Sequence, residues 1–133
     1  MARSRRAGIA AALDLGAEAA QLGTAFIACP ESSADRYHRD ALFDRGAAMT
    51  GMTTMISGRP ARCLSNKITA LEDAELKGLI APDYPITYDA GKALGAAARA
   101  KGEGGFGAQW AGQGAPSPAP CPPQTLSAFL MMN

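Results

Sequence analysis

An alanine-rich run of good helix formers covers residues 5–15, and Gly16 follows it directly. Alanine, leucine and arginine all favour the helical conformation. Glycine just after a helix readily takes the left-handed backbone conformation that ends it. The pattern therefore predicts a helix from Arg5 to Leu15 that stops at Gly16.

The next residues, Ala17–Ile27, are too apolar for an ordinary loop, and Gly23 interrupts them. A short apolar run bounded by glycines is typical of a buried strand in a parallel sheet. We predict a strand at Ala19–Leu22, a turn at Gly23–Thr24 and a helical turn from Ala25. Helix, glycine turn, strand and second turn follow one another in the αβ units of parallel sheets and barrels.

Polar caps, glycines and prolines mark the ends of the later elements. Ser32 and Ser33 can accept backbone amide bonds, which predicts a helix at Ala34–Phe43 with Asp35 in its first turn. The remaining predictions are β-tolerant chain at Met49–Ile56, a turn at Ser57–Pro60, a helix at Asn66–Leu79, irregular chain at Ala81–Pro85, and a helix at Asp89–Lys101 that Asp89 caps and Gly102 stops.

The character of the chain changes at Gly102. Residues 102–107 are rich in glycine, residues 109–114 (QWAGQG) are polar and aromatic, and residues 115–123 (APSPAPCPP) are dense in proline. Proline-rich chain cannot form a packed core, because proline lacks a backbone donor. We therefore predict a loop up to Ala115 and an irregular tail beyond it.

Composition and charge narrow the class of protein. The 13 basic and 12 acidic residues leave a net charge of +1, so no electrostatic field favours nucleic acid or an anionic membrane surface. Hydrophobic residues make up 47% of the chain and aromatic residues only 6%, which favours closely packed helices over a β-sandwich. No stretch approaches the length of a membrane span.

Three cysteines, Cys29, Cys63 and Cys121, lie far apart and lack any metal-ligand spacing. We interpret them as reduced thiols of a cytoplasmic protein. Arginines before the apolar residues 7–13 resemble the start of a secretion signal, but Asp14 and Glu18 interrupt that run. We therefore expect a cytoplasmic protein without a metal site.

Gln21–Thr24 (QLGT) is the segment with the clearest chemistry. Where a buried parallel strand ends, glycine lets the backbone approach a ligand, and a threonine hydroxyl with exposed amides can bind phosphate oxygens. A nucleotide cofactor needs a turn of this kind. The alternative is a plain turn, since Gly-Thr is common after strands.

Two other segments are candidates for binding. Residues 57–62 (SGRPAR) place two arginines around a rigid turn, which can clamp an anionic group or simply hold a helix end. Residues 110–114 (WAGQG) combine glycines that permit close approach, the amide of Gln113 and an indole face. Alternatively, Trp110 is a buried anchor for the loop.

His38 is the sole histidine, and no cysteine or carboxylate set lies near it at ligand spacing. We interpret it as a surface histidine rather than a catalytic base. Met49, Met52 and Met55 recur at helical spacing, and we expect them to fill gaps in the core. Because no catalytic triad, Walker loop or carboxylate pair stands out, we assign no catalytic residue.

Four segments in order resemble the C-terminal half of the nitronate monooxygenase (2-nitropropane dioxygenase-like) family: GIAAALDLGAEAAQLGTAFIACPESS, SGRPAR, APDYPI and QWAGQGA. The resemblance covers about residues 7–115. It implies an α/β fold that is the C-terminal part of an FMN-binding TIM-type barrel plus a smaller, mainly helical domain. The barrel is expected to be incomplete, because a whole one needs about 250 residues.

On this basis the chain divides into four regions. Residues 1–45 hold the last barrel helix, strand and phosphate-binding turn, and residues 46–101 form the smaller helical domain on the substrate side. Residues 102–115 form the WAGQG loop, and residues 116–133 form the irregular proline-rich tail, which departs from the family.

The resemblance also implies a cofactor site. In the family, the segment matched by QLGT holds the phosphate of FMN, and we add the glutamine of the WAGQG loop. The candidate cofactor-binding residues are Gln21, Leu22, Gly23, Thr24 and Gln113. The family's glycine pair for the same phosphate aligns with Met1 and Ala2, and its catalytic histidine lies further upstream, so this chain matches neither.

The activity that the resemblance implies is FMN-dependent oxidation of alkyl nitronates (nitroalkanes) with molecular oxygen, of which this chain would be a fragment. One alternative is a fragment of an NAD(P)H-dependent FMN reductase that acts on quinones or enoyl-acyl-carrier-protein. Another is a small non-enzymatic helical protein. The expected partners are FMN, a nitronate and the other part of the barrel, and we expect the chain alone to be inactive.

Overall fold

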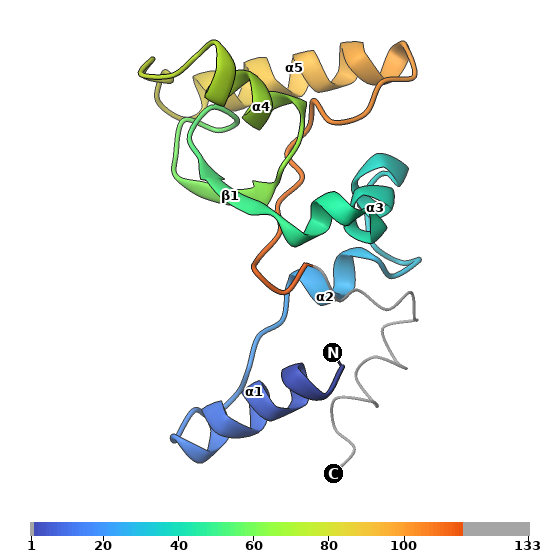
Figure 1. Cartoon of the computed structure of the whole chain (residues 1–133), viewed down its shortest axis with the longest axis vertical. Helices are drawn as coiled ribbons and strands as arrows, with labels where there is room; N and C mark the ends of the chain where they lie inside the picture. Colours follow the sequence, from blue (N-terminus) through green and yellow to red (C-terminus); the bar gives the residue numbers. More distant parts are fainter. Residues whose placement is uncertain (1, 116–133) are drawn as a thin grey trace.

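The computed structural model describes residues 2–115 (Figure 1). Cys121 and the predicted proline-rich tail lie outside this range. The elements in chain order are α1 (Ala2–Asp14), α2 (Thr24–Ile27), α3 (Arg36–Phe43), the 3-10 turn η1 (Arg45–Ala48), β1 (Thr50–Thr53), β2 (Ala61–Leu64), α4 (Lys67–Ala74) and α5 (Ile86–Ala100).

Helix α1 confirms the first predicted helix, but it begins at Ala2 rather than Arg5 and ends at Asp14, one residue before the predicted Leu15. Gly16 has a φ of 94°, the left-handed conformation that stops the helix. Figure 1 shows α1 lying apart from the other elements and joined to them by residues 17–22. Leu13 and Leu15 on this part of the chain are 45% and 89% exposed. The apolar side chains of α1 therefore have little of the described chain to pack against.

The predicted buried strand at Ala19–Leu22 is wrong for this structure. These residues form no ladder, and Ala19, Ala20 and Gln21 are exposed. A parallel strand exists only when neighbouring strands supply its backbone partners. Within residues 2–115 the only sheet is the β1–β2 pair. The segment is apolar, but among the described residues no strand lies beside it to bury it.

Helices α2 and α3 follow the predicted order with shifted starts. Helix α3 begins at Arg36 rather than Ala34, because Asp35 is its N-cap and accepts a bond from the His38 amide at 2.8 Å. The Ser32 hydroxyl accepts from the Ala34 amide at 3.1 Å, so it shapes the turn before the helix instead of capping it.

Strands β1 and β2 form an antiparallel pair in which Thr50 lies opposite Leu64 and Thr53 lies opposite Ala61. The β-tolerant residues around β1 were predicted, but β2 was not. Met49 and Met52 are 65% and 56% exposed, so the expectation that they fill the core is wrong. Along β1, Gly51 and Met52 are exposed, whereas Thr53 at the end of the strand is buried.

Helices α4 and α5 are both confirmed, with different limits. Asn66 caps α4 and forms a capping box with Thr69, and the helix ends at Ala74, before the predicted Leu79. Helix α5 begins at Ile86, so Asp89 lies in its first turn rather than at its cap. Gly102, with a φ of 77°, stops α5 as predicted.

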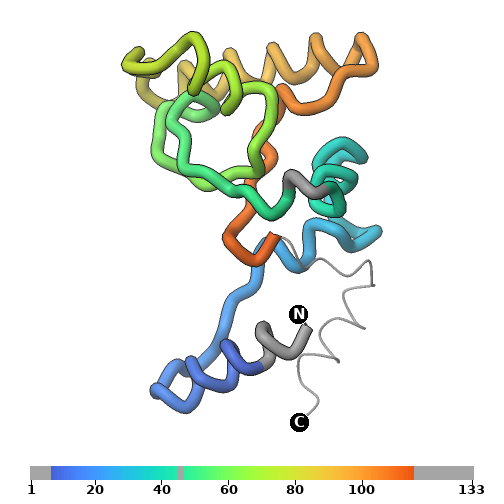
Figure 2. Tube along the Cα trace, in the orientation of Figure 1, coloured from blue at the N-terminus to red at the C-terminus, as the bar shows by residue number. Residues whose placement is uncertain are grey.

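Residues 105–112, which we call the closing segment, connect the β1–β2 pair to α2 and α3. Figure 2 shows this part of the chain, in orange to red, running from the end of α5 past the β1–β2 pair to α2. Its backbone extends the sheet through a bridge between Trp110 and Cys63. On one side Trp110 packs against Ile56, Cys63 and Ile68, and Ala111 joins the cluster around Leu42 and Leu64.

Two further observations concern membrane spans and metal ligands. In the part of the chain that the structure describes, no helix combines the length and the apolar character needed to cross a membrane. Across residues 2–115, no group of three or more histidine, cysteine, aspartate or glutamate side chains is arranged to hold a metal ion.

Candidate functional site

The predicted phosphate turn, Gln21–Thr24, leads directly into α2. Gln21 and Gly23 are exposed, while Leu22 is half-buried against Ala25 and Cys29. A Cβ added to Gly23 would meet no atom within 4 Å, so the backbone of the turn is open on that side. The Gly23 carbonyl accepts from the Phe26 amide at 3.0 Å, which fixes the first turn of α2.

Thr24 connects this turn to the WAGQG loop. The amide of Gly112 donates to the Thr24 hydroxyl oxygen at 2.8 Å. The structure thus brings together two predicted segments that lie far apart in the sequence. Gln113 lies in the turn just after Gly112 and is exposed. Thr24 and Gln113 are therefore on neighbouring segments, although no contact between their side chains is observed.

An open recess of about 300 Å³ lies beside the turn. Its lining combines the backbone of the turn, apolar side chains of α2 and two polar residues that follow the helix. The lining residues are Gly23, Phe26, Ile27, Cys29, Glu31 and Ser32.

The closing segment is fixed to α3 by two side-chain hydrogen bonds. His38 Nε2 lies 3.2 Å from the Trp110 carbonyl oxygen, and the side-chain amide of Gln109 donates to the Tyr37 carbonyl oxygen at 3.2 Å. Gln109 is buried, and its side-chain oxygen also accepts from Asn66 at 3.2 Å. These contacts hold the residues that lead to Gly112.

The interpretation of His38 as a surface residue is wrong. The ring is half-buried between α3 and Trp110, and this burial lowers the pKa of His38 below its usual value of 6.5. The bond to Trp110 and the nearby Asp35 carboxylate oppose the shift more weakly. Local sequence could not reveal this, because the partner of His38 lies 72 residues away.

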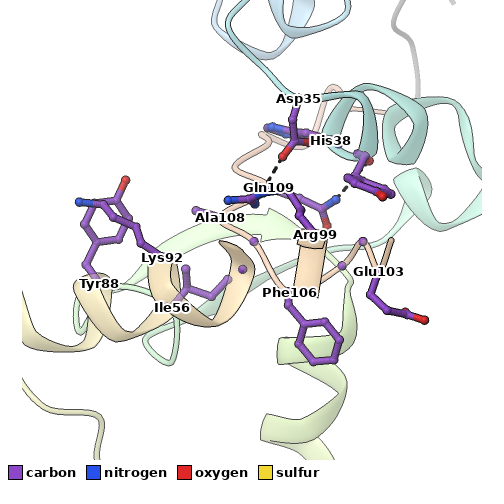
Figure 3. Close-up of a pocket in the computed structure, with 16 residues that line it drawn as sticks. Asp35, His38, Ile56, Tyr88, Lys92, Arg99, Glu103, Phe106, Ala108 and Gln109 are labelled. Atoms are coloured by element: carbon purple, nitrogen blue, oxygen red, sulfur yellow. Dashed lines mark hydrogen bonds and ion pairs between the residues drawn. The ribbon is translucent and has the colours of Figure 1, made fainter. Parts of the chain in front are cut away.

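A second cavity, of about 250 Å³, lies between α3, α5 and the closing segment (Figure 3). Arg99 and Asp35 form an ion pair at 3.5 Å on one side of it. Lys92 lies over the Tyr88 ring at 4.2 Å and pairs with Asp89 at 3.3 Å. Five of its lining residues are glycines, which contribute only backbone to its wall: Gly91, Gly95, Gly104, Gly105 and Gly107.

Comparison with known proteins identifies the family. The family model described as nitronate monooxygenase matches residues 4–124. A nitronate monooxygenase of Paraburkholderia phytofirmans is 56% identical over 124 residues, which are 93% of this chain and 34% of that protein. This chain belongs to the nitronate monooxygenase family.

Two further comparisons support this assignment. The Pseudomonas aeruginosa nitronate monooxygenase is 55% identical over 81% of this chain and 30% of its own length. A solved nitroalkane oxidase from Streptomyces ansochromogenes aligns with a TM-score of 0.84 and 38% identity, covering 94% of this chain and 35% of the oxidase. The chain thus spans about a third of the length of these relatives. The predicted fold class, part of a TIM-type barrel enzyme with mixed helix and strand, is confirmed.

The SGRPAR arginines of this nitronate monooxygenase family member do not converge on a common anion position. Arg62 donates to the Thr50 carbonyl oxygen at 2.9 Å and to the Thr50 hydroxyl at 3.2 Å. Arg59 lies over the Tyr84 ring, 5.0 Å from its centroid. The two guanidinium groups therefore contact different parts of the chain, β1 and the 81–85 loop.

The alternative predicted for Trp110 fits the structure better than an open stacking face, because its ring packs against the cluster around Ile56, Cys63 and Ile68.

Proposed function

We propose that this chain forms part of an FMN-dependent oxidoreductase that oxidises alkyl nitronates with molecular oxygen. Within it, Gln21, Leu22, Gly23, Thr24 and Gln113 contribute contacts to the FMN phosphate. The observation that supports this most directly is the hydrogen bond from the Gly112 amide to Thr24. It joins the segment that the family resemblance assigns to the FMN phosphate to the WAGQG loop, which carries the added candidate Gln113.

The Thr24 hydroxyl has the chemistry that a phosphate contact needs. Its oxygen accepts from Gly112, which leaves the hydroxyl proton free to donate in another direction. Gly23 has no Cβ and its open side meets no protein atom, so a phosphate oxygen can approach the backbone closely.

The residues of the turn offer a phosphate neutral donors, while the Glu31 carboxylate lines the same recess. In the described chain, no lysine or arginine lines the recess beside Gly23. The donors on offer are the Thr24 hydroxyl, backbone amides and the exposed amide side chains of Gln21 and Gln113. Bound FMN would supply the group that accepts electrons from the substrate. The residues of this chain would hold and orient its phosphate.

A comparison of FMN with riboflavin tests whether the Gln21–Thr24 turn contacts the phosphate. FMN and riboflavin differ only in the phosphate, so their affinities for the chain are measured by quenching of flavin fluorescence. Thr24→Val keeps the shape of the side chain and removes the hydroxyl, while Thr24→Ser keeps the hydroxyl and serves as the control. A hydrogen bond to a charged group contributes about 1.5–3 kcal/mol, so FMN binding should weaken about tenfold or more in Thr24→Val.

Gly23→Val should weaken FMN binding as well, because its side chain would occupy the open side of the turn. Riboflavin affinity should stay the same in all three variants. Equal FMN affinities in Thr24→Val and Thr24→Ser would refute the phosphate assignment. In an enzyme that carries these residues together with the rest of the barrel, oxygen consumption with an alkyl nitronate is compared with NAD(P)H oxidation in the presence of a quinone. This comparison separates the proposed activity from the reductase alternative.

A further inference from the structure

The position of Gly112 depends on what holds the two residues before it. Trp110 is fixed on its ring side, where it packs against Ile56, Cys63 and Ile68. Its carbonyl group faces the other way and meets His38 Nε2 at 3.2 Å. The Ala111 amide donates to the Arg62 carbonyl oxygen at 3.2 Å. The peptide that leads into Gly112 is thus held from the sheet on one side and from α3 on the other.

The direction of the His38 bond is fixed by chemistry. A carbonyl oxygen can only accept, so His38 Nε2 must carry the proton and donate it. The ring does not reach Thr24 or the recess beside Gly23, and it is not among the residues that line that recess. Any effect of His38 on the turn must therefore pass through Trp110, Ala111 and Gly112.

We propose that His38 is a positioning residue for the phosphate turn: its Nε2–H fixes the Trp110 carbonyl, and this places the Gly112 amide where it orients the Thr24 hydroxyl. The proposal rests on the assignment of Thr24 to the FMN phosphate made above. Without the bond, the Trp110 carbonyl loses its hydrogen bond to α3, although Ala111 still packs in the cluster around Leu42. The Gly112 amide then moves away from Thr24, and the hydroxyl loses its single orientation.

The link from His38 to Gly112 can be measured without any flavin. Hydrogen exchange of the Gly112 amide, followed by NMR, reports its bond to Thr24, and Thr24→Val gives the fully released rate. His38→Leu removes the donor at similar volume, whereas the amide of His38→Gln can still reach the carbonyl. Asp40→Asn, on the exposed face of α3, is the matched control.

Losing a bond of about 1 kcal/mol corresponds to about fivefold in an equilibrium, so His38→Leu should speed Gly112 exchange about threefold or more. His38→Gln and Asp40→Asn should keep the original rate, and amides within α5 should not change. An unchanged Gly112 rate in His38→Leu overturns the proposal. So does an equal increase in His38→Gln, because ring packing rather than the bond would then matter. If His38→Leu does not fold, His38→Asn, whose amide is too short to reach, replaces it.

Binding of FMN and riboflavin separates the positioning role of His38 from the phosphate contact of Thr24, on which it rests. Weaker FMN binding in His38→Leu, by about threefold or more, with unchanged riboflavin binding and recovery in His38→Gln, supports the positioning role. Weaker FMN binding in Thr24→Val but not in His38→Leu overturns the positioning role alone. Unchanged FMN binding in both variants overturns the phosphate site itself and the role of His38 with it.

Discussion

Gly58 packs so closely against the backbone at Tyr84 that a Cβ on Gly58 would lie 2.7 Å from the Tyr84 amide nitrogen. The same Cβ would overlap the Pro82 carbonyl oxygen. Gly58 also has a φ of 76°, in the left-handed region that side chains disfavour. The turn after β1 and the loop before α5 therefore meet backbone to backbone, and only glycine fits between them.

We expect Gly58→Ala to destabilise the chain severely. Gly78→Ala is the matched control, since Gly78 has a similar φ of 85° but an added Cβ there meets nothing within 4 Å. The control should lower the free energy of unfolding by about 1–2 kcal/mol for the backbone conformation alone. Gly58→Ala should cost about 1–3 kcal/mol more, from overpacking. Equal losses in urea denaturation of the two variants would contradict the close contact.

Asn66 has two roles that substitutions can separate. Its side-chain oxygen caps α4 by accepting from the Ile68 and Thr69 amides, and its Nδ2 donates to the Gly107 carbonyl oxygen and to Gln109. Asn66→Asp keeps the cap but replaces the donor with a carboxylate that faces two oxygens. Asn66→Ala removes both.

Both Asn66 variants should lower the free energy of unfolding, by about 1–3 kcal/mol for the lost donor in Asn66→Asp and by about 1 kcal/mol more in Asn66→Ala for the lost cap. Chemical denaturation followed by circular dichroism measures both. If Asn66→Asp were as stable as the original chain, the anchoring of the closing segment by Asn66 would be wrong.

His38 should make the stability of the chain fall in mild acid. Its pKa is lowered on folding by burial, so the unfolded chain, with a histidine pKa near 6.5, binds the proton more readily. The free energy of unfolding should therefore be fully present above pH 6.5 and decrease as the pH falls below it. His38→Gln lacks this contribution while retaining every carboxylate. Parallel pH profiles of the two proteins between pH 7.5 and 5.5 would show that His38 does not titrate differently on folding.

Cys63 should resist alkylation until the chain unfolds. It is fully buried, and burial, with a smaller contribution from the Glu72 carboxylate, raises the pKa of its thiol to about 11. Only about one such thiol in a thousand is ionised at pH 8, and the thiolate is the reactive form. Peptide mapping after iodoacetamide treatment should show Cys63 modified in urea but not in native buffer. Modification at equal rates in both conditions would contradict its burial.

The sequence predicted those parts of the fold that depend on neighbouring residues. Gly16 and Gly102 end their helices because glycine alone takes the left-handed conformation without strain, and this signal is local. Strand β2 escaped prediction because four residues after a proline carry no pattern of their own. Its identity comes from β1 on one side and the Trp110 bridge on the other.

In the candidate site, too, the features set by neighbouring residues were predicted and the contacts between distant residues were not. Gly23 and Thr24 were singled out from composition and resemblance, and the structure places Thr24 against Gly112 of the second predicted segment. The pairing itself was not predictable from spacing, because it joins residues 88 positions apart. The error at Ala19–Leu22 has a related cause, since an apolar run becomes a strand only beside another strand.

The closing segment also sets the order in which the chain can fold as it is synthesised. The β1–β2 pair and α4 use neighbouring parts of the chain and can form early. The contacts of Thr24, His38 and Tyr37 with residues 109–112 join distant parts of the chain, and such contacts form late because they close long loops. On the ribosome, Thr24, Tyr37 and His38 must therefore wait without these hydrogen-bond partners until the segment after α5 has emerged.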